Sequence, residues 1–244
     1  MLAYSFHQWH HPTGSRNRYT LCNGGSPGQQ PNSWLRSRII PVGDIHRLEV
    51  TVEYSSTICP SSFTFCNESF FAYVWESNTS VLSDKIPHPI SSFVSYRIFG
   101  SINRPLINPS VLTIPLEVKN KFIVLGFRDQ GGCRTVFSVK VSYSICPRKT
   151  LDYSLISLPR TLSPFSSMKS IQVNGSCATD SVQAVQGSMS VLCESSGEWN
   201  TSLLEGRCFC KENLENAGGN CKGIHFFLSR EGCFFSQLSP RPIQ

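Results

Sequence analysis

Eleven cysteines are the residues of this 244-residue chain whose type and spacing could support chemistry. Cysteine thiolates bind zinc, but structural zinc sites favour C-x-x-C pairs, and the sequence contains none. Cys208 and Cys210 form a C-x-C pair, and the other cysteines are widely spaced. We therefore expect disulfides, and with them an oxidising, secretory compartment. Because eleven is odd, one cysteine is expected to lack an intramolecular partner.

Four N-x-S/T sequences also suggest secretion, because they are acceptors for N-glycosylation. Their asparagines are Asn67, Asn78, Asn174 and Asn200. The first 14 residues lack the basic start and apolar run of a signal peptide, and no window has the ~18 apolar residues of a membrane span. We expect either a piece of a longer protein or a gene model that misses its first exon. A cytosolic protein with reduced thiols would leave the cysteine pattern unexplained.

Other kinds of site are poorly supported. His7, His10 and His11 lie in an N-terminal segment without nearby Asp, Glu or Cys, so we expect a solvated tail and no metal. No H-E-x-x-H or phosphate-loop motif occurs, so we expect no catalytic residues and no cofactor. The net charge of +6 comes from dispersed basic residues, which argues against a nucleic-acid partner.

The elements that must position the cysteines are predicted to be β-strands. Residues 134–145 alternate apolar Phe137, Val139, Val141 and Tyr143 with polar residues, as in a half-buried strand between Cys133 and Cys146. Residues 48–54 alternate in the same way. The segments 69–75 and 122–127 are continuously apolar, as in strands covered on both faces. Turn formers lie between these strands at 24–33, 86–92 and 101–110. The pattern predicts an all-β antiparallel sandwich.

The composition of the sequence changes after Cys146. Proline and serine become frequent, and six of the eleven cysteines lie in residues 177–233. A segment with so few apolar residues needs covalent crosslinks to stay folded. We therefore place a domain boundary near Cys146.

Eight short stretches occur in a recognisable order. They are "YTLCN", "SWLRSRII", "GDIHRLEVTVEYSSTICP", "FIVLGFRDQGGC", "FSVKVSYSICP", "VNGSC", "LCESSGEW" and "EGRCFC". The first four resemble the ligand-binding domain of Eph receptors, the receptors for ephrins, and the fifth resembles the exit of that domain. The last three resemble the sushi-like and EGF-like region that follows it. The resemblance runs in order from about Tyr19 to Cys221. It is weakest in residues 1–18 and 76–115, and the second cysteine expected soon after Cys221 is absent.

The resemblance implies a jelly-roll sandwich followed by small disulfide-rich modules. The expected parts are a truncated or poorly ordered segment at 1–18, the ligand-binding jelly roll at 19–145, a sushi-like module at 146–208, a partial EGF-like module at 209–233 and a disordered tail at 234–244. Any membrane helix and kinase would lie outside this chain. The expected location is extracellular, at the plasma membrane.

The family pattern also implies a disulfide pairing. The pairs are Cys22–Cys133, Cys59–Cys66, Cys146–Cys193, Cys177–Cys208 and Cys210–Cys221, which leaves Cys233 over. Cys59–Cys66 is expected to fix a hairpin between the 48–54 and 69–75 strands. Trp199 is expected to pack over the disulfides as most of the small core of the sushi-like module.

Eph receptors accept an apolar ephrin loop in a channel on the sandwich, so the resemblance implies an ephrin-like cell-surface protein as partner. The implied ligand-binding residues are Cys22, Asn23, Arg128, Asp129, Gln130, Gly131, Gly132 and Cys133, with Ile102 and Arg104 on a third wall. Gly131 is expected to adopt positive φ. Receptor clustering through the cysteine-rich region is also implied.

Two alternatives remain open. The chain could be a secreted decoy, or a carbohydrate-binding jelly-roll module that uses Trp9, Trp34 and Trp75 as aromatic platforms. Core packing is the competing interpretation of Trp34 and Trp75. Ephrin subclass is not expected to be readable from the sequence.

Overall fold

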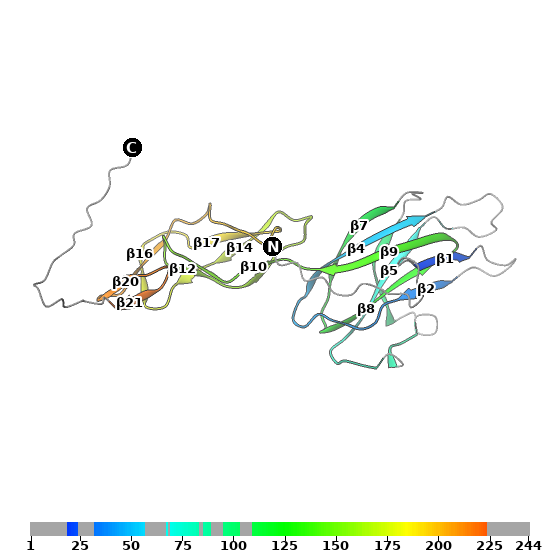
Figure 1. Cartoon of the computed structure of the whole chain (residues 1–244). Helices are drawn as coiled ribbons and strands as arrows, with labels where there is room; N and C mark the ends of the chain where they lie inside the picture. The colour runs from blue at the N-terminus through cyan, green and yellow to red at the C-terminus, as the bar shows by residue number, and fades with distance from the viewer. Residues whose placement is uncertain are drawn as a thin grey trace, which may run out of the picture. The chain divides into compact units, whose positions relative to one another are not determined.

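The computed structural model describes residues 19–23, 32–56, 67, 69–82, 85–88, 95–102 and 109–223, with the backbone alone for residues 20–23, 132 and 133. Within these ranges the regular structure is β-strand, apart from 3₁₀ turns at Lys85 and Ser95 (Figure 1). None of the described residues forms a helix long and apolar enough to cross a membrane. The all-β prediction is confirmed.

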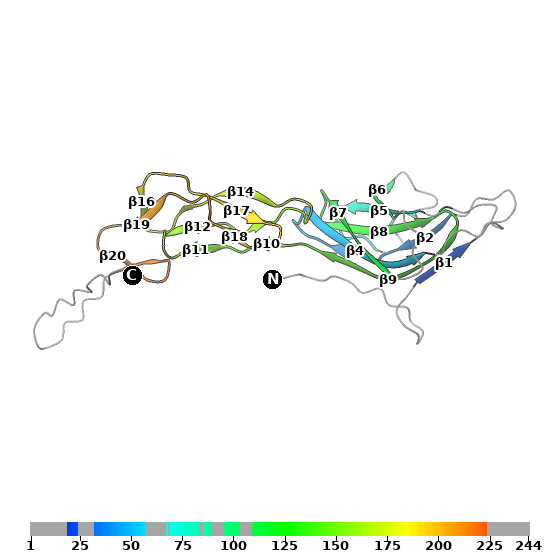
Figure 2. The same cartoon turned by 90° about the horizontal axis from the view of Figure 1, so that it is seen from above.

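Two antiparallel sheets form the sandwich of the N-terminal region (Figure 2). The first sheet has the order β1-β9-β4-β7, with β1 Tyr19–Asn23, β9 Gly132–Ser142, β4 Arg47–Ser56 and β7 Ser110–Glu117. The second sheet has the order β2-β8-β5-β6, with β2 Ser33–Arg36, β8 Phe122–Asp129, β5 Phe70–Ser77 and β6 Arg97–Ile102. The short β3, Ile40–Pro41, also pairs with β8.

The core lies between the two sheets because each sheet turns an apolar face inward. In β4, Leu48, Val50, Val52 and Tyr54 are buried, while the residues between them are only partly buried. Side chains of β8 and β5, including Phe127 and Phe70, fill the core from the second sheet. A period of two therefore predicted the inward face of β4 correctly.

The second sheet is also covered on its outer face. Val124 of β8 and Tyr73 of β5 form a separate buried cluster with Ile86 and Tyr96. Trp34 packs against this cluster from β2. The prediction that the 69–75 and 122–127 strands are covered on both faces is confirmed.

A β-bulge changes which residues of β9 face the core. The register with β4 pairs Glu53 with Ser138 but Tyr54 with Val136, so Phe137 is the extra residue. Such a bulge reverses the inward and outward sides of the strand beyond it. Val136 is therefore buried and Phe137 only half-buried, which corrects the alternation predicted from the sequence.

The predicted hairpin between the 48–54 and 69–75 strands is wrong. The partners of β4 are β7 and β9, whereas β5 pairs with β6 and β8 in the other sheet. The connection crosses from one sheet to the other, which the length of the chain between the two strands permits. Residues 57–66, which include Cys59 and Cys66, lie outside the described residues.

By internal contacts the chain divides into two units. The first contains residues 1–147, 160–173 and 192–200, and the second contains 148–159, 174–191 and 201–244. Besides the sandwich, the first unit contains β10 Ile145–Cys146, β13 Thr161–Leu162, most of β14 Ser170–Asn174, part of β17 Ser190–Glu194, and β18 Trp199–Asn200. Within it, the Arg47 guanidinium donates to the backbone oxygen of Leu162 at 2.8 Å.

The second unit is built from short strands. They are β11 Lys149–Leu151, β12 Ile156–Leu158, β15 Ser176–Cys177, β16 Ser181–Val185, β19 Arg207–Cys210, β20 Leu214–Asn216 and β21 Cys221–Gly223. β11, β12 and β15 form a three-stranded sheet, and β16–β19 and β20–β21 form two-stranded sheets. Leu151, Leu155, Ile156 and Leu158 supply most of its buried large apolar side chains.

Candidate ligand-binding surface

The fold brings together the two main walls predicted for the ligand surface. β1 pairs with the start of β9, with Cys22 opposite Cys133 and Asn23 opposite Gly132. Opposed residues of an antiparallel pair have Cα atoms about 4.5–5.5 Å apart, which lies within the range of disulfides. The register is thus compatible with a Cys22–Cys133 bridge. The bridge itself stays a prediction, because the structure describes only the backbone at these positions.

Gly131 makes the bend that joins β8 to β9. Its φ is +113°, a conformation that L side chains rarely adopt. The backbone oxygen of Gly131 accepts a hydrogen bond from the backbone N–H of Asn67 at 2.8 Å. The predicted positive φ is confirmed, and the bend is anchored to the chain that enters β5.

Arg128 is a predicted ligand-binding residue whose side chain reaches the surface. It is partly exposed at the end of β8, and its guanidinium lies 5.8 Å from the centre of the Trp34 ring. Its Nε donates to Asn32 Oδ1 at 2.8 Å, and the Trp34 indole N–H donates to the same oxygen at 3.0 Å. These contacts hold the cationic group in one orientation. Gln130, next along the turn, is also partly exposed.

Two predicted ligand-binding side chains are instead buried. Asp129 is 0% exposed and forms an ion pair with Arg134, which is 2% exposed. Ile102, at the end of β6, is 1% exposed and belongs to the core between the sheets. Neither side chain can touch a ligand in this structure. The reason is the same for both, since each occupies an inward position of its strand.

Arg134 is a residue that the sequence reasoning missed. It follows Cys133 in β9, and the alternation seen in 137–143 places it on the outward side. The bulge at Phe137 reverses that parity and turns Arg134 into the space between the sheets. The only sequence signal was a lone arginine beside an Arg-Asp-Gln-Gly-Gly turn, which does not reveal a bulge.

The Asp129–Arg134 pair is linked to the surrounding backbone. Arg134 also donates to the backbone oxygen of Asn67, and its guanidinium lies 5.5 Å from the centre of the Phe70 ring. Burial raises the pKa of the Asp129 carboxyl above its ordinary value, because desolvation outweighs the charge and hydrogen bond of Arg134 and the N–H of Gly131.

Trp34 and Trp75 pack into the sandwich and do not form an open platform for a sugar ring. Trp34 lies so close to Gly126 that a Cβ there would be 3.1 Å from the indole, and its ring centre is 5.0 Å from that of Tyr73. Trp75 also packs against this cluster. Core packing is therefore the better interpretation of both tryptophans. Trp9, Arg104, Cys233 and the three N-terminal histidines lie outside the described residues.

Among the described residues, three disulfides crosslink the cysteine-rich region. They are Cys146–Cys193, Cys177–Cys208 and Cys210–Cys221, the same three pairs that the family resemblance implies there. Trp199 pairs with Cys193 in the β17–β18 ladder but is only half-buried, and its indole N–H donates to the backbone oxygen of Pro147 at 2.7 Å. It therefore contributes less of the core than expected.

The four glycosylation asparagines differ in exposure. Asn78 and Asn174 are exposed, while Asn67 and Asn200 are half-buried. The side-chain oxygen of Asn67 accepts a hydrogen bond from the backbone N–H of Ser69 at 3.0 Å, and the Asn200 amide donates to Glu194 at 2.9 Å.

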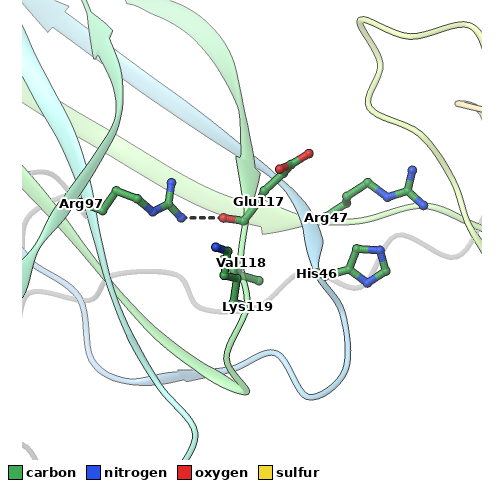
Figure 3. A pocket seen from close by; sticks show the side chains of 6 residues that line it. All are labelled: His46, Arg47, Arg97, Glu117, Val118 and Lys119. Atoms are coloured by element: carbon green, nitrogen blue, oxygen red, sulfur yellow. Dashed lines mark hydrogen bonds between the residues drawn. The ribbon is translucent and has the colours of Figure 1, made fainter.

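A hollow of about 570 Å³ (Figure 3) lies, by strand register, at the opposite end of the sandwich strands from Gly131. It is lined by His46, Arg47, Arg97, Glu117, Val118 and Lys119. The Arg97 guanidinium is already engaged, because it donates to the backbone oxygen of Glu117 at 2.6 Å (Figure 3) and also to Glu76 Oε1 at 2.8 Å. The hollow shares no residue with the predicted ligand surface.

Comparison with known proteins gives matches over most of the chain. A family model described as the ephrin receptor ligand binding domain matches residues 4–146, and one described as the ephrin cysteine rich domain matches residues 151–210. The chain is 29% identical to ephrin type-B receptor 2 of Gallus gallus, over 91% of this chain and 24% of that protein. It is 26% identical to ephrin type-B receptor 5 of Gallus gallus, over 81% and 21%.

A third relative is ephrin type-A receptor 4-B of Xenopus laevis, which is 26% identical over 84% of this chain and 21% of that protein. The chain thus spans between a fifth and a quarter of the length of these relatives. The two matched regions are a ligand-binding domain and a cysteine-rich domain. Because the first model covers more than half of the sequence, the chain belongs to the family of ephrin receptor ligand-binding domains.

Proposed function

We propose that this chain binds a cell-surface ephrin through the surface around the β8–β9 turn, as the extracellular ligand-binding part of an Eph-type receptor. The observation that supports this most is the arrangement of Arg128. It is partly exposed beside the Gly131 bend and is held by Asn32 and Trp34. A pre-oriented arginine loses little conformational entropy on binding and is a frequent interface anchor.

The proposal includes the extracellular location and the absence of catalysis in this chain. The three disulfides of the cysteine-rich region are typical of an oxidising compartment. A tyrosine kinase, if the parent protein has one, would lie outside the two matched regions. Sequencing of the full transcript separates a membrane receptor from a secreted decoy, which would end without a membrane helix.

Binding to immobilised ephrin ectodomains of both classes tests the function. We expect binding by the wild type and a loss of about tenfold or more in Arg128→Glu, because a reversed charge at an interface anchor is strongly unfavourable. Lys121→Glu is the matched control. Lys121 immediately precedes β8 and is 60% exposed, so the same reversal at the other end of the strand should leave affinity within about twofold.

A glycan array measured in parallel tests the carbohydrate-binding alternative. Glycan binding without ephrin binding would reject the receptor proposal.

Clustering through the cysteine-rich region is a further part of the proposal, and sedimentation velocity of the whole chain over a range of concentrations tests it. In the second unit Val182 lies opposite Phe209, and the two are 50% and 54% exposed. Phe209→Asp should therefore weaken self-association if this face contributes.

A further inference from the structure

A buried ion pair bridges the two sheets directly beneath the proposed ligand surface. Asp129 is the last residue of β8 in the second sheet, and Arg134 lies near the start of β9 in the first sheet. Their exposed fractions are 0% and 2%. The turn between them contains Gln130, Gly131, Gly132 and Cys133, so the pair closes that turn from the inside.

The pair also fixes a third segment. Arg134 donates to the backbone oxygen of Asn67 as well as to Asp129. The N–H of Asn67 donates to the oxygen of Gly131 at 2.8 Å, and the N–H of Gly131 approaches Asp129 Oδ2 at 3.4 Å. The contacts form a closed circuit of four residues, in which the Gly131 bend is held from both its N–H and its oxygen.

Stability alone is a poor explanation for this arrangement. Two charges removed from water lose hydration that their attraction restores only when every remaining donor and acceptor is satisfied. The buried Nε of Arg134 and the buried Oγ of the facing Ser56 have no hydrogen-bond partner among the described residues. An incompletely satisfied buried pair is better explained by the conformation that it selects than by the stability that it adds.

We infer that Asp129 and Arg134 are positioning residues for the ligand, and that they act through the conformation of residues 130–133. This inference rests on the proposed ephrin-binding function of the same surface. Arginine is required because its planar fork reaches a carboxylate and a carbonyl at once, which the single ammonium of lysine cannot do in the same geometry.

The test compares Arg134→Lys with the wild type in the full chain. Lysine keeps the charge opposite Asp129 but loses the bond to Asn67. At a temperature where each variant is fully folded, we expect Arg134→Lys to weaken ephrin binding about tenfold, mainly through faster dissociation. Dissociation kinetics against an immobilised ephrin ectodomain measure this, and thermal melting of each variant verifies the folded state.

The double variant Glu76→Gln/Arg97→Met is the matched control, because it removes another ion pair of the same sandwich, whose N–O distance is 2.8 Å. It should lower the thermal midpoint without changing the dissociation rate. Unchanged dissociation in Arg134→Lys, or an equal change in the control, would overturn the inference.

Hydrogen exchange separates this inference from the function on which it rests. We expect faster amide exchange in residues 130–136 of Arg134→Lys than in the wild type or the control. If the wild type binds no ephrin, the proposed function fails, but faster exchange would still support the positioning of the turn. Identical exchange in all three proteins would contradict the positioning role, whatever the ligand.

Discussion

The sandwich and the cysteine-rich region are both built from β-strands, but they are stabilised in different ways. β4, β8 and β9 have 8–11 residues each, long enough to place a row of apolar side chains between two sheets. All the described strands that lie within the second unit have only two to five residues, and their core is mainly three leucines and one isoleucine beside disulfides. Strand length therefore decides how far the stability of each region comes from buried apolar side chains or from covalent crosslinks.

Their ion pairs also differ, because among the described residues only the sandwich contains a buried one. In the sandwich, buried Asp129 and Arg134 sit where the two sheets meet, and their partners are held by long strands. In the second unit the ion pair Lys211–Asp180 is exposed, with side-chain exposures of 56% and 53%. Exposed pairs contribute little, whereas a buried charge without its partner is strongly unfavourable. Mutations should therefore affect the two regions unequally.

The largest expected effect is on the sandwich, from Arg134→Met. This change leaves the Asp129 carboxylate buried without its cation, and we expect a loss of about 3–5 kcal/mol of unfolding free energy. Urea denaturation followed by hydrogen exchange of β4 peptides measures it. Asp129→Leu/Arg134→Met, which removes both charges, should recover most of the loss. A single variant as stable as the wild type would show that the pair is not buried in solution.

The next largest effect is on the second unit, from Cys177→Ser/Cys208→Ser. Removing a crosslink between residues 31 positions apart should lower stability by about 3–4 kcal/mol on the chain-entropy model. Amide exchange should rise in residues 148–159 and 174–191 while β4 stays protected. An equal rise of amide exchange in β4 would contradict the expected difference between the two regions.

A smaller effect is expected at Glu76, where the sandwich uses a partly buried carboxylate to hold a turn. Burial opposes its ionisation, but hydrogen bonds from Arg97, Lys119 and Asn120, with the Arg97 charge, together lower the pKa of Glu76 below its ordinary value of 4.5. We expect Glu76→Gln to lose about 1–3 kcal/mol at neutral pH.

The loss depends on pH because the pKa of Glu76 is lower in the folded state than in the unfolded state. The unfolded state binds the proton more readily, so the contribution of Glu76 is complete above pH 4.5 and is lost as pH falls through the lowered folded-state pKa. The difference between wild type and variant should therefore shrink below pH 4.5 in melts recorded from neutral to acidic pH. A constant difference over that range would mean that Glu76 acts through packing and not through its charge.

The smallest effect is expected at the surface pair Asp44–Lys121. Its atoms are 3.7 Å apart, and the side chains are 93% and 60% exposed. Asp44→Asn should change stability by less than about 0.5 kcal/mol, and added salt should make that difference smaller. A larger change of unfolding free energy in a urea titration would show that this pair contributes more than its exposure indicates.

The sequence by itself determined the strands whose apolar residues follow one unbroken period, as in β4, and the strands covered on both faces, β5 and β8. The positive φ of Gly131 was also predicted, because a backbone bend beside an expected disulfide often needs that conformation. The cysteine-rich pairing came from family resemblance, since spacing alone does not select among the possible connectivities.

Only the tertiary structure decided the interior of the candidate site. A one-residue bulge at Phe137 turned Arg134 inward, and no local pattern in β9 shows where such a residue is inserted. The sheet assignment of β4 and β5, and the burial of Ile102 and Asp129, likewise depend on strand partners far away in the sequence. Local periodicity specifies which residues alternate, but packing between two sheets specifies which side of the alternation becomes the core.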